Sequence, residues 1–362
     1  MTTEPKLRAV LLDDIMRGDF IRTIRNDFAE LKEFLLSEER RTRLADMNRL
    51  SRFLHLSWWL LKSLLLRLAP ARRLLLALGI LFYFFGDRMI QVGDRVQVGS
   101  DFRPIAAALF LFVLMLELKD KLVAREELEA GRAVQAALMP ERGPLVAGWE
   151  LWLFTRSANE VGGDLLDFIR LDDGKFGVAV GDVAGKGLRA ALLTTKLQST
   201  LRAFVTDKSS LQNLGSRLNV VFNRDSLPSL FASLLYFELD EKSDAIRFVN
   251  AGHIPPMIVR TGGVEKMEKG GMALGLASDA TFVEQAAEVR SGEMILAYSD
   301  GLTEAQNESG DFYGEQRVLN LVPEIRSLSA VKAGERVMDS VTRFVGNARA
   351  ADDITIAILK RA

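Results

Sequence analysis

The sequence contains no cysteine and only two histidines, His55 and His253, among its 362 residues. Without cysteine the chain cannot form disulfides, bind a metal through thiolates or use a cysteine nucleophile. Two histidines are too few for a histidine-rich metal centre. Any metal site must therefore use carboxylates, backbone carbonyls and water, the ligands that Mg²⁺ and Mn²⁺ prefer.

The chain also lacks an excess of charge of either sign, with 47 Lys and Arg against 48 Asp and Glu. Such a balance gives no electrostatic basis for binding nucleic acid, and we predict no nucleic-acid partner. The length exceeds that of one ordinary domain, so the sequence predicts more than one structural part.

What the sequence does contain is a set of acids at the ends of strand-like apolar runs. Asp164 follows a Gly-Gly pair, Asp182 and Asp300 each end an apolar run, and the pair Asp352-Asp353 precedes another. A strand fixes the position of an acid, and a glycine turn beside it lets a ligand approach the backbone. Each acid alone is more often an ordinary turn residue. Together, the four acidic strand ends indicate a functional carboxylate cluster.

The N-terminal part divides into two segments before the linker. Residues 1–73 are predicted as a helical, basic and amphipathic region, and Trp58 and Trp59 among its arginines suit a membrane interface. A soluble helix that packs on a partner is the alternative. Residues 74–118 hold two uncharged apolar runs, Leu74–Phe85 and Pro104–Leu116, joined by a loop in which the charges balance.

Both apolar runs are shorter than the about 20 residues that usually span a bilayer. Arginine and lysine flank the pair on its outer sides, as expected for a hairpin with both ends in the cytoplasm, and such side chains can lengthen a short span. We therefore predict a membrane anchor at residues 74–118, with a soluble dimerising hairpin as the alternative.

A helical linker is predicted at residues 119–140. The run Glu117–Met139 is rich in helix-forming residues and stops at Pro140. Its leucine spacing is only loosely heptad, so a parallel coiled coil is possible, and we predict a homodimer formed through this helix.

Residues 141–362 are predicted to form one α+β domain in which helices flank mainly antiparallel sheets. The reason is that predicted strands follow one another along the chain, as predicted helices do, without strict alternation of the two. Strand patterns occur at Trp149–Phe154, Phe168–Leu171, Phe176–Val180, Phe231–Leu239, Ile246–Asn250, Met257–Arg260, Met294–Tyr298 and Ile354–Leu359. Helical patterns occur at Leu188–Val205, Ser210–Arg224, Gln316–Ile325 and Ala330–Val345.

Six sequence blocks occur in the following order along the chain: VGGDLLD, GDVAGKGLRAALL, FASLLYFELD, NAGHIPP, AYSDGLTEAQNESGDFYG and ADDITIAIL. They resemble the signature blocks of SpoIIE-like and RsbU-like bacterial phosphatases, which belong to the metal-dependent (PPM) superfamily of protein serine/threonine phosphatases. The resemblance covers about residues 128–362 and does not extend to residues 1–115.

The resemblance implies an αββα sandwich of two mainly antiparallel sheets flanked by helices, preceded here by the helical, membrane-associated region and the linker. It implies two Mn²⁺ or Mg²⁺ ions that activate a water to hydrolyse phosphoserine or phosphothreonine. The implied partner is a phosphorylated regulatory protein, such as an anti-sigma factor antagonist. With the anchor, it places a cytoplasmic catalytic domain on the inner membrane. The alternative is a catalytically silent PPM-fold binding or regulatory module on the same anchor.

The resemblance also assigns the site residues. It implies that Asp164, Asp182, Asp300 and Asp352 are the catalytic, metal-binding acids and that the Val183 carbonyl adds a ligand. Asp353 stands where relatives often have Asn, and of this last pair we favour Asp352 as the ligand.

Two departures from the family pattern concern proton transfer and phosphate binding. Ala184 stands where many eukaryotic relatives have a histidine proposed as general acid. The phosphate-binding arginine of those relatives has no clear counterpart, and Arg156 and Lys186 are only weak candidates. For His253, in the NAGHIPP block, we predict a structural role in a turn rather than acid catalysis.

Overall fold

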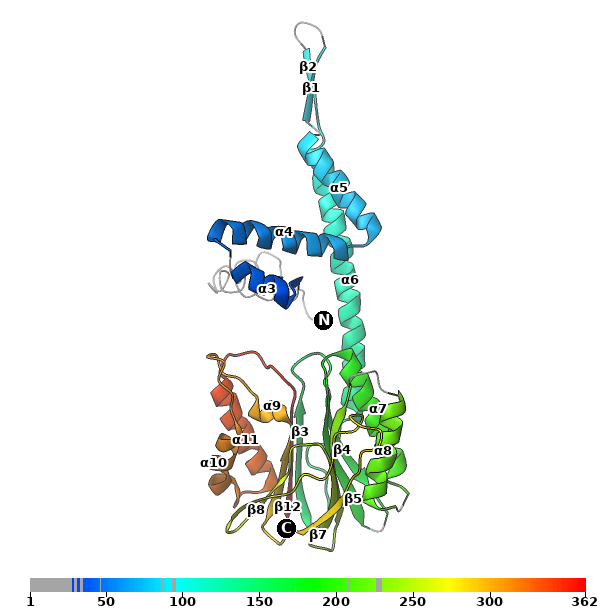
Figure 1. Ribbon diagram of the computed structural model, residues 1–362, viewed down its shortest axis with the longest axis vertical. Coiled ribbons are helices and arrows are strands. Elements are labelled where there is room, and N and C mark those ends of the chain that lie inside the picture. The colour runs from blue at the N-terminus through cyan, green and yellow to red at the C-terminus, as the bar shows by residue number, and fades with distance from the viewer. Residues whose placement is uncertain are drawn as a thin grey trace, which may run out of the picture. The chain divides into compact units, whose positions relative to one another are not determined.

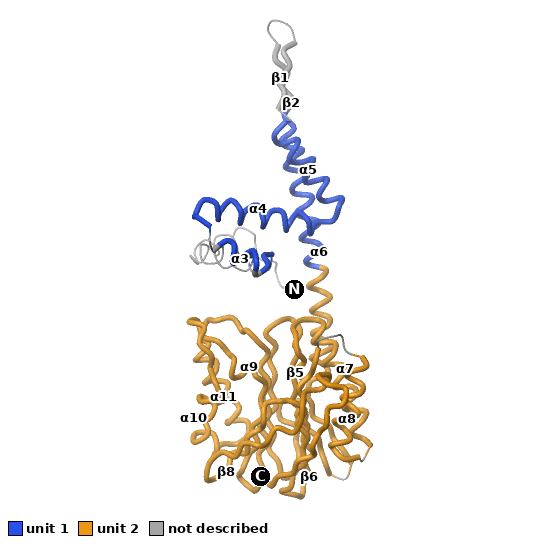
Figure 2. The backbone as a smooth tube through the Cα atoms, viewed as in Figure 1, with its two compact units in different colours: residues 1–122 blue, residues 123–362 orange. Residues whose placement is uncertain are grey.

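Figure 1 shows the computed structural model of the chain. It describes residues 28, 31–32, 35–45, 47–85, 87–92, 96–172, 174–207, 209–225 and 230–362. The chain divides into two compact units, Met1–Leu122 and Val123–Ala362 (Figure 2). Residues 1–27 of the predicted N-terminal helical region lie outside the described residues.

The first unit consists mainly of helices: α3 (Glu38–Ala45), α4 (Arg49–Arg67), α5 (Pro70–Phe85) and the first part of α6 (Arg103–Leu138). Leu36, Leu44 and Leu60 form a small apolar cluster. Much of the apolar surface of α4 is exposed, including Phe53 and Trp58. Exposed apolar side chains of this kind suit contact with a partner or a membrane surface, and the amphipathic region stays a prediction.

Helices α5 and α6 pack against each other. A Cβ added to Gly79 of α5 would lie 2.7 Å from the ring of Phe110, so the glycine permits close approach. Near the other end of α5, Arg72 pairs with Glu117 and Asp120, each at 2.6 Å. The contacts join early residues of one helix to late residues of the other, so the two helices form an antiparallel hairpin.

Two details of this region differ from the sequence predictions. The connection between the apolar runs is not a plain loop, because β1 (Asp87–Val92) and β2 (Val96–Asp101) form an antiparallel ribbon within it. The second apolar run and the linker are one continuous helix, α6. The reason is that good helix formers follow Pro104 without another proline before Pro140.

Within the described residues, no helix combines the length and the apolar character that crossing a bilayer requires. The membrane anchor and the homodimer through the linker helix stay predictions.

The second unit contains two five-stranded sheets in which all neighbouring strands are antiparallel. The first has the order β10-β7-β6-β5-β4, with β4 (Asp164–Arg170), β5 (Lys175–Val183), β6 (Ala232–Asp240), β7 (Ala245–Ala251) and β10 (Glu284–Glu288). The second has the order β3-β12-β11-β8-β9, with β3 (Trp149–Arg156), β8 (Met257–Arg260), β9 (Gly263–Lys266), β11 (Met294–Tyr298) and β12 (Ile354–Arg361).

Helices cover the outer face of each sheet (Figure 1). The first sheet carries α7 (Leu188–Phe204) and α8 (Leu211–Asp225), and the second carries α10 (Glu315–Ile325) and α11 (Ala330–Val345). Alternation along the strands creates the layers. Val178 and Val180 pack between the sheets, whereas Ala179 faces the helices. The predicted αββα sandwich is confirmed.

The predicted strands differ from the observed ones in segments whose sequence shows only a weak strand pattern. Strand β4 begins at Asp164, four residues before the predicted run, and β9 and β10 were not predicted. The segment Glu284–Glu288 has two glutamates and two alanines, which favour strands poorly. It becomes a strand because β7 offers an edge to pair with.

Candidate metal centre

The first two acids face each other across neighbouring strands. Asp164 opens β4, Asp182 lies near the end of β5, and the two residues are direct partners in the antiparallel ladder. Because the strands run in opposite directions, the Gly-Gly turn before Asp164 and the glycine loop after Asp182 meet at one edge of the first sheet.

The remaining acids come from the second sheet. Asp300 follows β11 and opens the short helix α9 (Asp300–Thr303), while Asp352 and Asp353 precede β12. Strands β11 and β12 are antiparallel neighbours, so these residues also share one edge. Ser299 Oγ donates a hydrogen bond of 2.8 Å to Asp164 Oδ2, which joins the two edges. The sequence analysis did not identify Ser299; its only signal is its position directly before Asp300.

The carboxylates are close enough to oppose one another's ionisation. Burial, followed by repulsion from Asp300 and Asp352, raises the pKa of Asp182 to about 6. Burial raises the pKa of Asp164 well above its usual range. Burial and the charge of Asp352 also raise the pKa of Asp300. Clustered acids with raised pKa values are stabilised in their charged form by a bound cation.

The two adjacent acids before β12 have different surroundings. Asp353 is buried, and its carboxylate accepts hydrogen bonds from the backbone N–H of Ala158 at 2.7 Å and of Gly163 at 2.6 Å. The side chain of Asp352 is 42% exposed and lies 3.4 Å from Lys186 Nζ. Asp353 therefore organises the turn before Asp164, while Asp352 has oxygen atoms accessible from solvent.

A glycine brings further oxygen atoms together. A Cβ added to Gly163 would lie 3.1 Å from the carbonyl oxygen of Val183 and 3.3 Å from Asp182 Oδ1. The two oxygens therefore border the same small space, which a side chain at position 163 would fill. Carboxylate and carbonyl oxygens are hard ligands suited to Mg²⁺ or Mn²⁺.

The donor chemistry thus fits a divalent cation, and the structure brings together all the acids that the sequence singled out. Within the part of the chain that the structure describes, however, no three acidic or imidazole groups are gathered round a single point.

His253 is positioned as a structural residue rather than an acid. Its ring is buried, which lowers its pKa to about 4, so it is neutral near neutral pH. Ser233 Oγ lies 2.8 Å from its Nδ1, and the Asn250 side chain bonds both its backbone N–H and its carbonyl. These contacts hold the turn that follows β7, as the sequence analysis predicted.

We expect His253→Ala to retain most of the phosphatase activity that the resemblance implies and to lower the free energy of unfolding by about 1–3 kcal/mol, because it removes a buried hydrogen-bonded ring. Turnover rate and thermal melting of the variant, measured side by side, check this. A rate loss of about a thousandfold with unchanged melting would instead indicate acid catalysis.

Two cationic side chains border the acids. Lys186 Nζ donates to the carbonyl of Ala351 at 2.8 Å and lies beside Asp352. Arg156 lines a hollow of about 280 Å³ that Gly301 and Asp352 also line. Ala184, whose N–H donates to the carbonyl of Phe231, offers no acidic proton.

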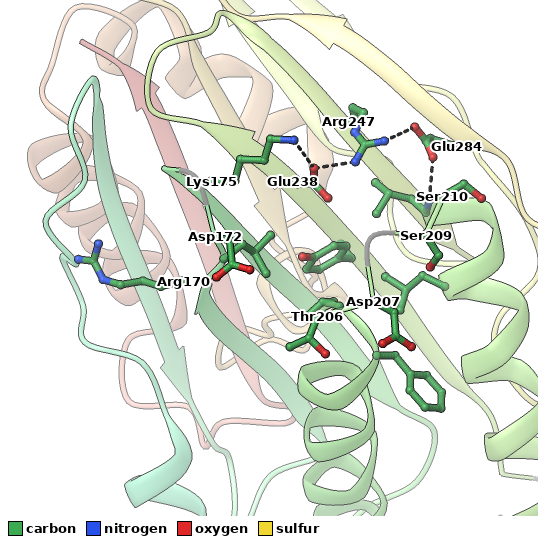
Figure 3. A pocket seen from close by; sticks show the side chains of 16 residues that line it. Arg170, Asp172, Lys175, Thr206, Asp207, Ser209, Ser210, Glu238, Arg247 and Glu284 are labelled. Carbon is green, nitrogen blue, oxygen red and sulfur yellow. Dashed lines mark hydrogen bonds and ion pairs between the residues drawn. The ribbon is translucent and has the colours of Figure 1, made fainter.

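A separate cavity of about 460 Å³ lies at the other end of β4 and β5 (Figure 3). Four of its charged groups are paired with one another: Glu238 contacts Lys175 at 3.6 Å and Arg247 at 2.6 Å. Arg247 also contacts Glu284 at 3.0 Å, and Glu284 accepts from the N–H of Leu211. Since the described residues that line it include none of the clustered acids, we assign the chemistry to the other end of the sheets.

Comparison with known proteins adds an independent line of evidence. Residues 172–362 match the family model described as "Stage II sporulation protein E (SpoIIE)". The phosphoserine phosphatase RsbU of Bacillus subtilis is 24% identical over 239 residues, which cover 66% of this chain and 70% of RsbU. Protein IcfG of Synechocystis is 28% identical over 231 residues, and these cover 56% of this chain but only 36% of IcfG.

Solved structures agree on the architecture. The SiaA-PP2C domain of Pseudomonas aeruginosa superposes with a TM-score of 0.57 at 18% identity, over 67% of this chain and 98% of that domain. The RsbU and RsbW domains of a Mycobacterium tuberculosis protein give 0.51 at 23% identity, over 60% and 61% of the two chains. At these identities the likeness establishes the fold.

Proposed function

This chain belongs to the SpoIIE family, and from that premise we propose that it is a metal-dependent protein serine/threonine phosphatase. We assign the activity to the predicted catalytic domain, residues 141–362. The observation that carries the proposal is the convergence of acids from both sheets: Asp164 and Asp182 from one, and Asp300 and Asp352 from the other. The raised pKa values of Asp164, Asp182 and Asp300 indicate a site built to receive positive charge.

Asp164, Asp182, Asp300 and Asp352, with the Val183 carbonyl, would hold two divalent ions, Mn²⁺ or Mg²⁺. Once bound, such ions supply an activated water and neutralise charge on the phosphoryl oxygens. Asp353 keeps the Gly-Gly turn in place through its backbone hydrogen bonds. The chain needs no nucleophile of its own, in agreement with its lack of cysteine.

Lys186 and Arg156 are the cations available to a substrate phosphate at this edge. Lys186 is exposed beside Asp352, and Arg156 lines the adjoining hollow. Both residue types bind phosphate oxygens, arginine in a bidentate manner. We propose a phosphorylated regulatory protein as the substrate, such as an anti-sigma factor antagonist, because the related RsbU is a phosphoserine phosphatase.

Hydrolysis of p-nitrophenyl phosphate and of a phosphoserine peptide by the full-length protein tests the proposal. We expect turnover that requires Mn²⁺ or Mg²⁺ and stops when EDTA removes the ion, because the acids alone offer no activated nucleophile. The measurement is phosphate release against metal concentration.

The matched control is Asp339→Asn, which removes an exposed acid on α11 and should leave this rate unchanged. A folded protein that binds Mn²⁺ yet hydrolyses neither substrate would contradict the proposal. That result would favour the alternative of a catalytically silent module.

A further inference from the structure

A buried glutamine connects the end of α6 to the turn before Asp164. Gln135 is only 8% exposed. Its Nε2 donates to the carbonyl of Gly162 at 2.8 Å, and the N–H of Gly162 donates to its Oε1 at 3.1 Å. The amide of Gln135 thus pairs with both the N–H and the carbonyl of Gly162, the two groups that a residue of a neighbouring strand would otherwise pair with.

Gly162 is enclosed on its other side by the acid cluster. A Cβ added to it would lie 2.6 Å from Asp353 Oδ2 and 2.6 Å from Ser157 Oγ. The next N–H groups, of Gly163 and Asp164, both point to Asp353 Oδ2, at 2.6 and 3.4 Å. The segment that leads into Asp164 is therefore held between Gln135 and Asp353.

The end of α6 is itself fixed to the sheet. The carbonyl of Leu138 accepts hydrogen bonds from Gln198 and Arg202 of α7. Arg202 also makes a two-pronged contact with the buried Asp167 of β4, at 2.7 and 2.8 Å. Earlier in α6, Gly131 lies beside Val161, because a Cβ added to it would make an ordinary contact of 3.8 Å with that side chain. Gln135 therefore stands at a defined position relative to the strand that begins with Asp164.

We infer that Gln135 is a positioning residue that sets the affinity of the acid cluster for divalent ions by holding the turn Gly162–Asp164. The inference rests on the proposed phosphatase function. It follows from geometry, because the turn Gly162–Asp164 is held between Gln135 and Asp353 and small shifts of this turn move Asp164 relative to the other acids. Residues that orient metal ligands are typically worth about 10–100-fold in metal affinity.

The test uses the full-length protein with Gln135→Met, which keeps the length of the side chain and removes both hydrogen bonds. Calorimetry measures the Mn²⁺ dissociation constant, and thermal melting with and without Mn²⁺ gives a second readout. We expect the dissociation constant to rise about 10–100-fold. The turnover rate at saturating Mn²⁺ should stay within about threefold of wild type, because the residue does not touch substrate.

Asn219→Leu provides the matched control. Asn219 is also a buried helical amide with a reciprocal bond to a loop, accepting from the N–H of Gly275 and donating to the carbonyl of Ala277. Its loss should lower the melting temperature and leave Mn²⁺ affinity unchanged. If Gln135→Met fails to fold, Gln135→Leu offers a second shape with the same expected result.

A Gln135 variant that melts earlier, as Asn219→Leu does, but binds Mn²⁺ like wild type would overturn this inference and leave the proposed function standing. A wild-type protein that neither binds a divalent ion nor turns over substrate would overturn the proposed function, and this inference with it.

Discussion

Asp182→Asn and Asp300→Asn are each expected to abolish Mn²⁺-dependent turnover while leaving the fold intact. Each substitution removes one charged oxygen ligand from the proposed centre, and loss of metal-ion charge stabilisation costs several kcal/mol in the transition state, or more than about 100-fold in rate. Phosphate release at saturating Mn²⁺ measures the effect. Near-normal activity in either variant would mean that these acids do not bind the catalytic ions.

The first of these substitutions, Asp182→Asn, should also stabilise the metal-free protein in a pH-dependent way. Burial and neighbouring acids raise the pKa of Asp182 from 3.8 to about 6, so the folded state keeps a proton that the unfolded state releases. The wild type therefore loses stability as the pH rises from about 4 through about 6, by roughly 1–3 kcal/mol. The asparagine side chain of the variant carries no charge and escapes this loss.

Melting temperatures of metal-free Asp182→Asn and wild type, compared across this pH range, check the expectation. The variant should melt at the same temperature as wild type near pH 4 and at a higher temperature above about pH 6. The control Asp339→Asn should show no such divergence. A variant that is less stable than wild type at every pH would show that the neighbouring acids do not destabilise the charged Asp182 carboxylate.

The second large effect separates the two adjacent acids before β12. Asp352→Asn should reduce turnover by about two orders of magnitude or more, because it alters a proposed ligand. Asp353→Asn should cost less than about tenfold in turnover but about 1–3 kcal/mol in stability, because an amide cannot accept all the backbone N–H groups that the carboxylate accepts.

Turnover and melting of both variants, measured together, distinguish the roles. Equal losses of activity with unchanged melting would mean that both acids serve the metal centre directly. A larger loss of activity in Asp353→Asn would reverse the assignment.

The sequence by itself determined most of the secondary structure of the second unit. The apolar run Phe176–Val180 predicted a strand, and the helical spacing of Ala330–Val345 predicted α11 to the residue. Burial of these periodic faces is a local property, because the pattern along one segment decides which side faces the core. The order of acids and glycines likewise sufficed to indicate a carboxylate site.

Tertiary structure alone decided how those acids are surrounded. Asp352 and Asp353 are adjacent in the sequence, yet only the turn around residues 158–164 makes Asp353 a buried acceptor. Ser299 contacts Asp164 across 135 positions, and Gln135 contacts Gly162 across 27. The strand β10 forms for a similar reason, since its residues favour strands poorly and β7 supplies the partner. No local pattern specifies such contacts, because they depend on which segments the packed sheets bring together.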